Sequence, residues 1–485
     1  MKAERQKKAV ILITIDALRA GNLESYGYHR NTAPNIEKFA ENGTIFLNAI
    51  TNGPESPTAF SSLFTSILPF LDGGYSPLPP HKISLPQLLK ENGIYTYAIH
   101  SNPNLGRYFN YNRGFDVFLD GEKYKKQSKN NLTPQLSFYL KKFFNFNNLS
   151  NKLMYRVKGF NRLKNWLRKK MPFLTDILLP FTPIAYNAPY IVNKLISFLN
   201  SIIKPYFIWA HFMDVHSPYN PPMRNVLNFR KKDFNNTERE FLISKVYSNA
   251  GDIKITPKMV RDLQTLYDAE INFVDDCIAN FIEIIKKRIK KNCLIIITAD
   301  HGESFYEHGL FGHQGSVYDE VLKIPLMIIE LGKNSIKKKV QEMVQLIDLT
   351  PTILEYFSLE IPENFQGVSL LPMIKGESIK IKDFVISECY QKSGLMKRNR
   401  KEGFILLAIR NQGWKYIFDE ENNAEYLFNL KIDPQEKNSM INKNPEKLSE
   451  FRTIKQYHLK KITETYEEKL KITKSIDKLV LDKLK

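Results

Sequence analysis

The sequence predicts one large α/β domain, built on a mostly parallel sheet that helices flank, followed by a small antiparallel subdomain. Three observations lead to this prediction. Runs of consecutive apolar, β-branched residues recur along the chain, helical patterns separate them, and shorter strand patterns with turn residues begin after about residue 376. Strands that alternate with helices form parallel sheets, and strands covered on both faces are apolar at every position.

Three of the predicted strands end in charged or imidazole residues. They cover residues 9–15, 206–210 and 294–298. The polar residues at or just beyond their ends are Asp16, His211, Asp214, His216, Asp300 and His301. Because ligands bind outside the carboxyl ends of the strands in an open α/β sheet, these strands point to one shared site.

Helical patterns occupy the segments between the strands, at residues 34–41, 84–92 and 259–287. Their apolar residues recur at helical spacing. We expect the main domain to span residues 1–373. A basic insertion interrupts it at about residues 121–199, where apolar and aromatic residues alternate with Lys and Arg as in amphipathic helices.

Two interpretations of this insertion compete. Its helices pack on the core and expose a basic face to solvent, or they form a surface that lies on anionic membrane.

The C-terminal part of the chain follows another pattern. Residues 374–445 contain short strand patterns punctuated by glycines, which predict a small α+β subdomain with an antiparallel sheet. Residues 446–485 are charged and predict a helical tail.

The bulk composition is that of a globular protein with a large core. The chain has 485 residues, of which 43% are hydrophobic. Its 70 Lys and Arg against 51 Asp and Glu give a net charge of +19, which attracts anions but does not choose among nucleic acid, lipid and sulfated or phosphorylated substrates. The three cysteines are too few and too scattered for a disulfide framework or a zinc cluster.

The N-terminal segment predicts a location. Residues 1–8 are basic, but the apolar run after them ends at Asp16 and lacks a small-residue cleavage site. A membrane-spanning helix needs about 18 or more apolar residues. We therefore expect a cytoplasmic protein, peripheral to the membrane if the insertion binds lipid.

Asp16, Asp300 and His301 are the candidate metal ligands. Divalent cations such as Ca²⁺ and Mg²⁺ prefer hard oxygen ligands, which carboxylates at strand ends supply. His301 can join them as a ligand or donate to substrate oxygens. The alternative for Asp16 alone is that it caps the next helix.

Ordered motifs along nearly the whole chain resemble those of the sulfatase family within the alkaline phosphatase superfamily. The matching segments are Ile15–Arg19, Tyr26–Tyr28, Thr32–Ile36, Gly43–Phe46, His211–Tyr219, Thr298–Glu303, Gly312–His313, Tyr318–Glu320, Ile324–Leu326, Asp348–Thr352, Gly367–Pro372, Leu427–Leu430 and Asp433–Glu436. The resemblance implies an alkaline phosphatase-like fold. It also implies a metal-dependent hydrolase of sulfate esters.

The resemblance places the nucleophile at Ser56. The family uses a Cys or Ser, oxidised to formylglycine, in a Cys/Ser-x-Pro-x-Arg motif. Here Thr58 stands in place of the Pro and Phe60 in place of the Arg, so we expect an unmodified Ser56 that attacks directly. The alternatives are that Ser56 is a turn residue and that Thr58 takes its role.

The resemblance also assigns the remaining site residues. The family has an Asp-Asp pair where this chain has Asp16-Ala17, so one metal carboxylate is missing. We expect Ca²⁺ at the site, with Mg²⁺, Mn²⁺ and Zn²⁺ as alternatives. His216 and His313 match family positions that contact the ester, and either can protonate the leaving group. His100 lies where the family has a Lys-x-His pair, and it is the third candidate.

The sequence therefore predicts hydrolysis of a sulfate ester on a small molecule or glycan. Two alternatives remain open: a phosphatase or phosphoryl-type transferase of the same superfamily, and a non-catalytic binding protein with a degenerate site. The partners expected are the ester substrate and, in the second interpretation of the insertion, anionic membrane. We expect no nucleic acid partner, and the oligomeric state is left open.

Overall fold

The computed structural model describes residues 8–72, 77–121, 186–202, 205–248, 253–332, 338–377, 382–390 and 406–483. Nearly all of them belong to one compact unit, formed by residues 1–120 and 186–485. Residues 121–185 form a second unit, and beyond Gly121 they lie outside the described residues. Both interpretations of the basic insertion therefore stay predictions for that segment.

The core of the unit is an eight-stranded sheet in the order β10-β2-β9-β6-β1-β5-β3-β4. Its strands are β1 (Ala9–Ile15), β2 (Thr44–Ile50), β3 (Tyr95–Ile99), β4 (Val117–Leu119), β5 (Tyr206–Phe212), β6 (Cys293–Ala299), β9 (Lys323–Leu331) and β10 (Lys338–Gln345). Only β9 runs antiparallel to its neighbours in this sheet. The predicted large, mostly parallel sheet is confirmed.

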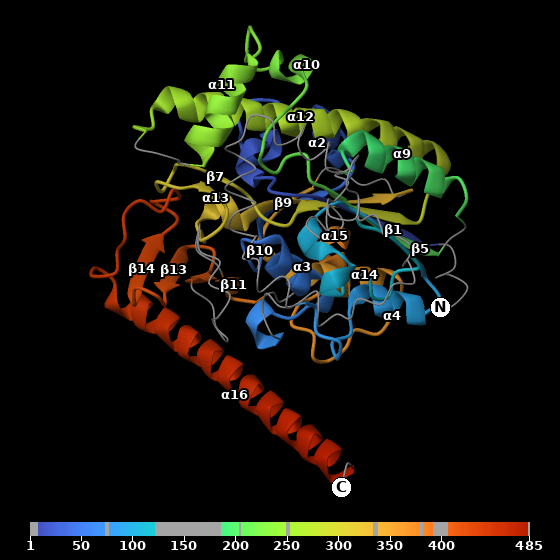
Figure 1. The fold of residues 1–485 in the computed structure, drawn as a ribbon, viewed down its shortest axis with the longest axis vertical. Coiled ribbons are helices and arrows are strands. Elements are labelled where there is room, and N and C mark those ends of the chain that lie inside the picture. The colour runs from blue at the N-terminus through green and yellow to red at the C-terminus, as the bar shows by residue number, and fades with distance from the viewer. Residues whose placement is uncertain are drawn as a thin grey trace, which may run out of the picture. The chain divides into compact units, whose positions relative to one another are not determined.

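Helices cover both faces of the sheet, which explains why β1, β5 and β6 are buried at every position. One layer contains α2 (Pro34–Ala40), α9 (Ala188–Leu199), α10 (Met223–Val226) and α12 (Pro257–Arg288). The other contains α3 (Ser56–Thr65), α4 (Leu85–Glu91), α14 (Leu349–Tyr356) and α15 (Leu371–Lys375). Contacts link the helices within each layer, and Figure 1 shows the sheet between them.

Short elements connect these layers. They are η1 (Ala20–Asn22), η2 (Glu24–Tyr26), η3 (Pro69–Asp72), η4 (Pro103–Leu105), η5 (Arg107–Phe109), α11 (Asn236–Phe241), the π-helix η6 (Leu242–Tyr247), α13 (Asp319–Leu322) and η7 (Leu346–Asp348). A two-stranded hairpin joins β7 (Ser304–Phe305) to β8 (Phe311–Gly312). In the described parts of the chain, no helix is long and apolar enough to cross a membrane.

The predicted C-terminal antiparallel sheet is also present. It contains β11 (Val385–Cys389), β12 (Leu406–Arg410), β13 (Trp414–Asp419) and β14 (Ala424–Asn429) in sequence order. An apolar cluster that includes Ile50 and Leu322 joins it to the main sheet. The helix α16 (Pro445–Lys483) follows and buries Leu448 and Phe451 against this sheet.

Candidate active site

The carboxyl ends of the central strands lie side by side. Ile15, the last residue of β1, is opposite Phe212 of β5 and Ala299 of β6. Asp16 and Asp300 directly follow two of these strands, so their carboxylates project from the same edge of the sheet. The local sequence places each acidic residue immediately after an apolar strand, and the order of the strands in the sheet brings the two residues together.

The Asp16 carboxylate is the centre of the site. It is fully buried, and its Oδ2 lies 3.1 Å from His211 Nε2, 3.1 Å from Asn102 Nδ2 and 3.3 Å from Ser56 Oγ. Its Oδ1 has no hydrogen-bond partner. One oxygen is thus held by three side chains, and the other is available to a ligand.

Asp300 and His301 also present unpaired atoms. Asp300 Oδ1 accepts hydrogen bonds from the backbone N–H groups of His301 at 3.0 Å and Ala17 at 3.3 Å, while Oδ2 has no partner. His301 Nδ1 lies 2.9 Å from the Gly302 carbonyl oxygen. A carbonyl only accepts, so Nδ1 donates, and neutral His301 has a lone pair on Nε2.

These unpaired atoms converge. His301 Nε2 lies 3.7 Å from Asp16 Oδ1 and 3.6 Å from Asp300 Oδ2, and none of the three atoms has a hydrogen-bond partner. Burying polar atoms without partners is costly. One divalent cation bound by two carboxylates and an imidazole would satisfy all three, so the residues present fit such an ion.

His211 lies within the same group. Ligand atoms of Asp16, His211 and Asp300 all lie within 4.8 Å of one another. The other ring nitrogen of His211 is 2.9 Å from Thr14 Oγ1. In the tautomer with the proton on Nδ1, that nitrogen donates to Thr14 and the Nε2 lone pair is free for a cation. In the tautomer with the proton on Nε2, this nitrogen donates to Asp16. The sequence placed His211 at a strand end but gave it no role.

Nearby histidines stabilise the ionised form of the buried carboxylates. Burial raises the pKa of Asp16, but its electrostatic interactions with His216, His211 and His301 outweigh burial and lower that pKa below its ordinary value. Burial likewise raises the pKa of Glu303, which His313 and His216 lower below its ordinary value. Both carboxylates therefore remain ionised near neutral pH.

Ser56 is the hydroxyl that faces Asp16. It begins α3 and is 7% exposed, and Asn102 Nδ2 donates to its Oγ at 3.0 Å. The backbone N–H of Asn104 donates to Asn102 Oδ1 at 3.0 Å, which directs Nδ2 towards the site. Thr58 instead donates to the Glu55 carbonyl at 2.8 Å. Of the two candidate hydroxyls, that of Ser56 is the one placed beside the Asp16 carboxylate.

Ala17 and Phe60 occupy the two positions where the chain departs from the sulfatase motifs. Ala17 is buried with φ +58°, and its backbone N–H, rather than a second carboxylate, meets Asp300. Phe60 packs its ring 5.0 Å from that of His211 and 4.9 Å from that of Trp209. Phe60 therefore supports the imidazole of His211 from the apolar side.

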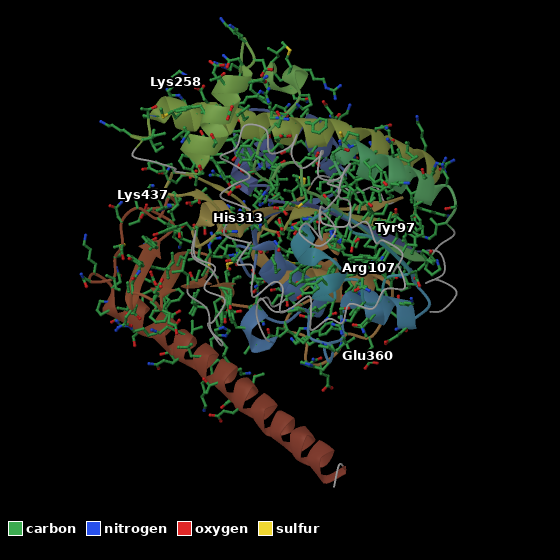
Figure 2. All side chains as sticks on the ribbon, in the orientation of Figure 1. Tyr97, Arg107, Lys258, His313, Glu360 and Lys437 are labelled. Atoms are coloured by element: carbon green, nitrogen blue, oxygen red, sulfur yellow. The ribbon has the colours of Figure 1, made fainter. Side chains whose placement is uncertain are left out.

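His313 and His216 lie on one side of the site. The His313 ring stacks on His301 at 4.0 Å and meets His216 edge-on at 5.2 Å. Its Nδ1 lies 3.3 Å from Oε1 of the buried Glu303. His216 Nδ1 lies 2.6 Å from the Ser217 carbonyl. Figure 2 places His313 near α13 and β7.

His100 lies behind the site. Its ring is fully buried, 4.9 Å from the Trp209 ring and 5.0 Å from the Phe118 ring. Burial lowers its pKa well below the ordinary value. The resemblance assigned the segment around His100 to the site. In the structure, Asn102 of that segment contacts Asp16, and His100 does not. Asn102 carried no sequence signal beyond its position in that segment.

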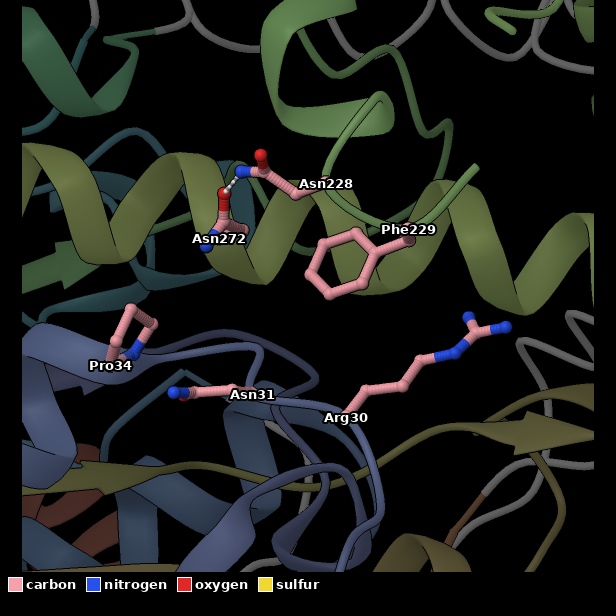
Figure 3. A pocket seen from close by; sticks show the side chains of 6 residues that line it. All are labelled: Arg30, Asn31, Pro34, Asn228, Phe229 and Asn272. Atoms are coloured by element: carbon pink, nitrogen blue, oxygen red, sulfur yellow. Dashed lines mark hydrogen bonds between the residues drawn. The ribbon is translucent and has the colours of Figure 1, made fainter. Parts of the chain in front are cut away.

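A surface depression of about 450 Å³ lies elsewhere (Figure 3). Segment 30–34, α12 and the residues after α10 line it. Its lining residues are Arg30, Asn31, Pro34, Asn228, Phe229 and Asn272. They include none of the residues around Asp16, so this depression plays no part in the candidate site.

Comparison with known proteins identifies the family of the chain. Residues 8–359 match the family model Sulfatase, and residues 306–465 match N-sulphoglucosamine sulphohydrolase, C-terminal. The chain is 23% identical over 467 residues to an arylsulfatase of Clostridium perfringens (strain 13 / Type A), with 90% of each chain covered. It is also 23% identical over 467 residues to arylsulfatase K of Canis lupus familiaris, covering 90% of this chain and 79% of that protein.

A solved structure shares the fold. It was determined in complex with its substrate D-glucosamine-2-N,6-O-disulfate, and it matches with a TM-score of 0.69 at 17% identity, covering 94% of this chain and 98% of that one. This likeness confirms the predicted alkaline phosphatase-like α/β fold. Since the family model spans most of the chain, the protein belongs to the sulfatase family of the alkaline phosphatase superfamily and is a sulfuric ester hydrolase.

Proposed function

We propose that the protein hydrolyses the sulfate ester of a sugar or another small molecule, with Ser56 as nucleophile and a divalent cation at Asp16, Asp300 and His301. One observation supports this most directly. Asp16, Asp300 and His301 each present a buried ligand atom without a partner, and Asp16 contacts a serine hydroxyl that Asn102 orients. We propose Ca²⁺ as the ion, with Mg²⁺, Mn²⁺ and Zn²⁺ as alternatives.

The bound cation would supply positive charge to the ester oxygens and to the Ser56 hydroxyl. Ser56 Oγ attacks sulfur in line, the Oγ–S bond forms, and the bond between sulfur and the ester oxygen breaks. His216 or His313 gives a proton to the departing alcohol and regains one as the serine proton is released. Water then cleaves the sulfated serine and releases sulfate.

Phosphate ester hydrolysis is a second candidate. Thr58 and Phe60 depart from the motif for formylglycine formation, and an unmodified serine is also the nucleophile of phosphate-cleaving relatives in the superfamily. Intact-protein mass spectrometry separates the possibilities. A loss of two hydrogens at Ser56 would indicate formylglycine, and a phosphate adduct at Ser56 would support phosphoryl chemistry.

Turnover of an aryl sulfate and an aryl phosphate, each with several divalent cations, tests the proposal. We expect sulfate turnover that depends on the cation and is abolished in Ser56→Ala. Thr58→Ala is the matched control, because its hydroxyl faces Glu55, and it should retain activity. Full activity of Ser56→Ala would remove Ser56 from the mechanism.

Location remains a proposal as well. We propose a cytoplasmic protein in which the basic insertion at about residues 121–199 forms helices that pack on the core with a solvated basic face, with a surface that lies on anionic membrane as the alternative. Co-sedimentation with vesicles, with and without anionic lipid, separates the two. Retention in the supernatant agrees with the first, and salt-sensitive pelleting with anionic vesicles supports the second.

A further inference from the structure

Three aromatic rings extend from His313 to the surface, and we name Tyr247, Phe311 and Tyr306 the aromatic shelf. The Tyr247 hydroxyl donates to Glu303 Oε2 at 3.1 Å, and the other oxygen of Glu303 meets His313. The Tyr247 and Phe311 rings are 6.2 Å apart, and Tyr306 stacks on Phe311 at 5.1 Å with an interplanar angle of 26°.

Exposure increases along the shelf. Tyr247 and Phe311 are half-buried, while Tyr306 is 37% exposed. In the described part of the chain, the Tyr306 hydroxyl has no hydrogen-bond partner. The outer end of the shelf is thus a flat apolar face with a polar group at its edge.

The β7–β8 hairpin carries Tyr306 and Phe311 of the shelf, and His313 directly follows its second strand. Phe305 pairs with Phe311, and Ser304 with Gly312. The Tyr306 N–H donates to the Leu310 carbonyl at 2.8 Å and closes the turn. Phe311 is only two residues from His313, which directly follows β8, so the hairpin places the ring and the imidazole close to each other.

The backbone around the shelf is unusual in three places. Tyr306 has φ +72°, which is costly for a residue with a side chain, and such strain concentrates at functional sites. Tyr247 ends the π-helix η6, a rare conformation that is frequent at functional sites. At Gly312 an added Cβ would come within 3.3 Å of the Tyr247 hydroxyl. At these three places the backbone accepts a cost in local stability and holds the rings of the shelf in position.

We infer that the aromatic shelf binds the pyranose ring of a sulfated glycan whose ester is cleaved beside His313. A pyranose presents apolar C–H faces that stack on aromatic rings and hydroxyls that the Tyr306 edge can meet. A lipid tail would leave that hydroxyl unpaired. The inference rests on the proposed function, because it assumes that the ester lies between Ser56 and His313.

Binding of a sulfated disaccharide to the Ser56→Ala protein, measured by calorimetry with Ca²⁺ present, tests the inference without turnover. Tyr306→Gly removes the ring, and glycine adopts the positive φ without strain, so the variant should fold. We expect the Kd to rise about three- to tenfold. Tyr306→Phe keeps the stacked ring and should lose less affinity than Tyr306→Gly.

Tyr426→Ala is the matched control. Tyr426 is 38% exposed and stacks on Phe428 in the C-terminal sheet, so its removal should leave the Kd unchanged. An unchanged Kd in Tyr306→Gly, or an equal loss of affinity in Tyr306→Gly and Tyr426→Ala, would contradict glycan binding at the aromatic shelf. If the Tyr306 ring contributes to disaccharide binding but the wild-type protein does not turn over sulfate esters, only the proposed function is contradicted.

Discussion

At the scale of single residues, the site depends on side chains that orient Ser56 and Asp16. Asn102 is the clearest of these, because its Nδ2 donates to both and its Oδ1 is held by Asn104 N–H. It is 2% exposed. In the proposed reaction, Asn102 would fix the direction of the Ser56 hydroxyl.

Asn102→Ala should therefore lower kcat about 10- to 100-fold, with a smaller change in KM, because the Ser56 hydroxyl loses the donor that fixes it. Steady-state kinetics with an aryl sulfate measures this. Asn104→Ala is the control, since only the backbone N–H of Asn104 contacts Asn102. A wild-type kcat in Asn102→Ala would contradict the assignment.

His100 leads to a prediction about pH. Burial lowers its pKa well below 6.5, so the folded protein holds it neutral while the unfolded chain protonates it below about pH 6.5. Its contribution to stability is complete above that pH and is lost as the pH falls, by about 1 kcal/mol per pH unit. His100→Leu should flatten this dependence in denaturation measured from pH 7 to pH 5.

The same variant tests the catalytic role that the sequence suggested for His100. Because its ring lies between Trp209 and Phe118, we expect the folded variant to turn over sulfate esters. Loss of turnover in a folded His100→Leu protein would restore His100 as a catalytic candidate.

At the scale of secondary structure elements, β11 links the loop before Ser56 to α16. Glu388 N–H donates to the Asn52 carbonyl at 3.0 Å, and Cys389 Sγ lies 3.3 Å from Glu55 Oε1. From α16, His458 Nε2 lies 2.6 Å from Oε1 of Glu388. The helix thus supports the strand that positions the segment before Ser56.

His458→Ala should destabilise the protein by about 3 kcal/mol, because it leaves the buried Glu388 carboxylate without that partner. Thermal unfolding measures this as a lower Tm. Tyr457→Ala, at the adjacent and 59% exposed position, should change the Tm little. Equal Tm values for the two variants would argue against the link.

At the scale of the whole molecule, the cation should couple to folding. A ligand present at about 100 times its Kd stabilises a folded protein by about 2.7 kcal/mol. Ca²⁺ should therefore raise the Tm of the wild-type protein, and a chelator should lower it. Asp300→Asn should respond less, because it lacks one carboxylate of the site. An unchanged Tm with every divalent cation would favour a site without a bound metal.

The sequence by itself determined the sheet and the metal-ligand candidates. Runs such as Ala9–Ile15 are almost entirely apolar and are buried at every position because both faces of the sheet are covered, and Asp16 and Asp300 lie at its carboxyl edge because they follow such runs. The C-terminal sheet was equally predictable, since glycine-punctuated strands have local signals.

Only the tertiary structure decided which side chains meet there. Asn102, His211 and Glu303 come from separate segments, and no local pattern says that they face Asp16, Ser56 or His313. Position in the sequence also could not tell whether Ser56 or Thr58, or whether His100 or Asn102, contacts Asp16. Side-chain direction depends on the rotation of each loop and helix against its neighbours, and that rotation is fixed by packing across the whole core.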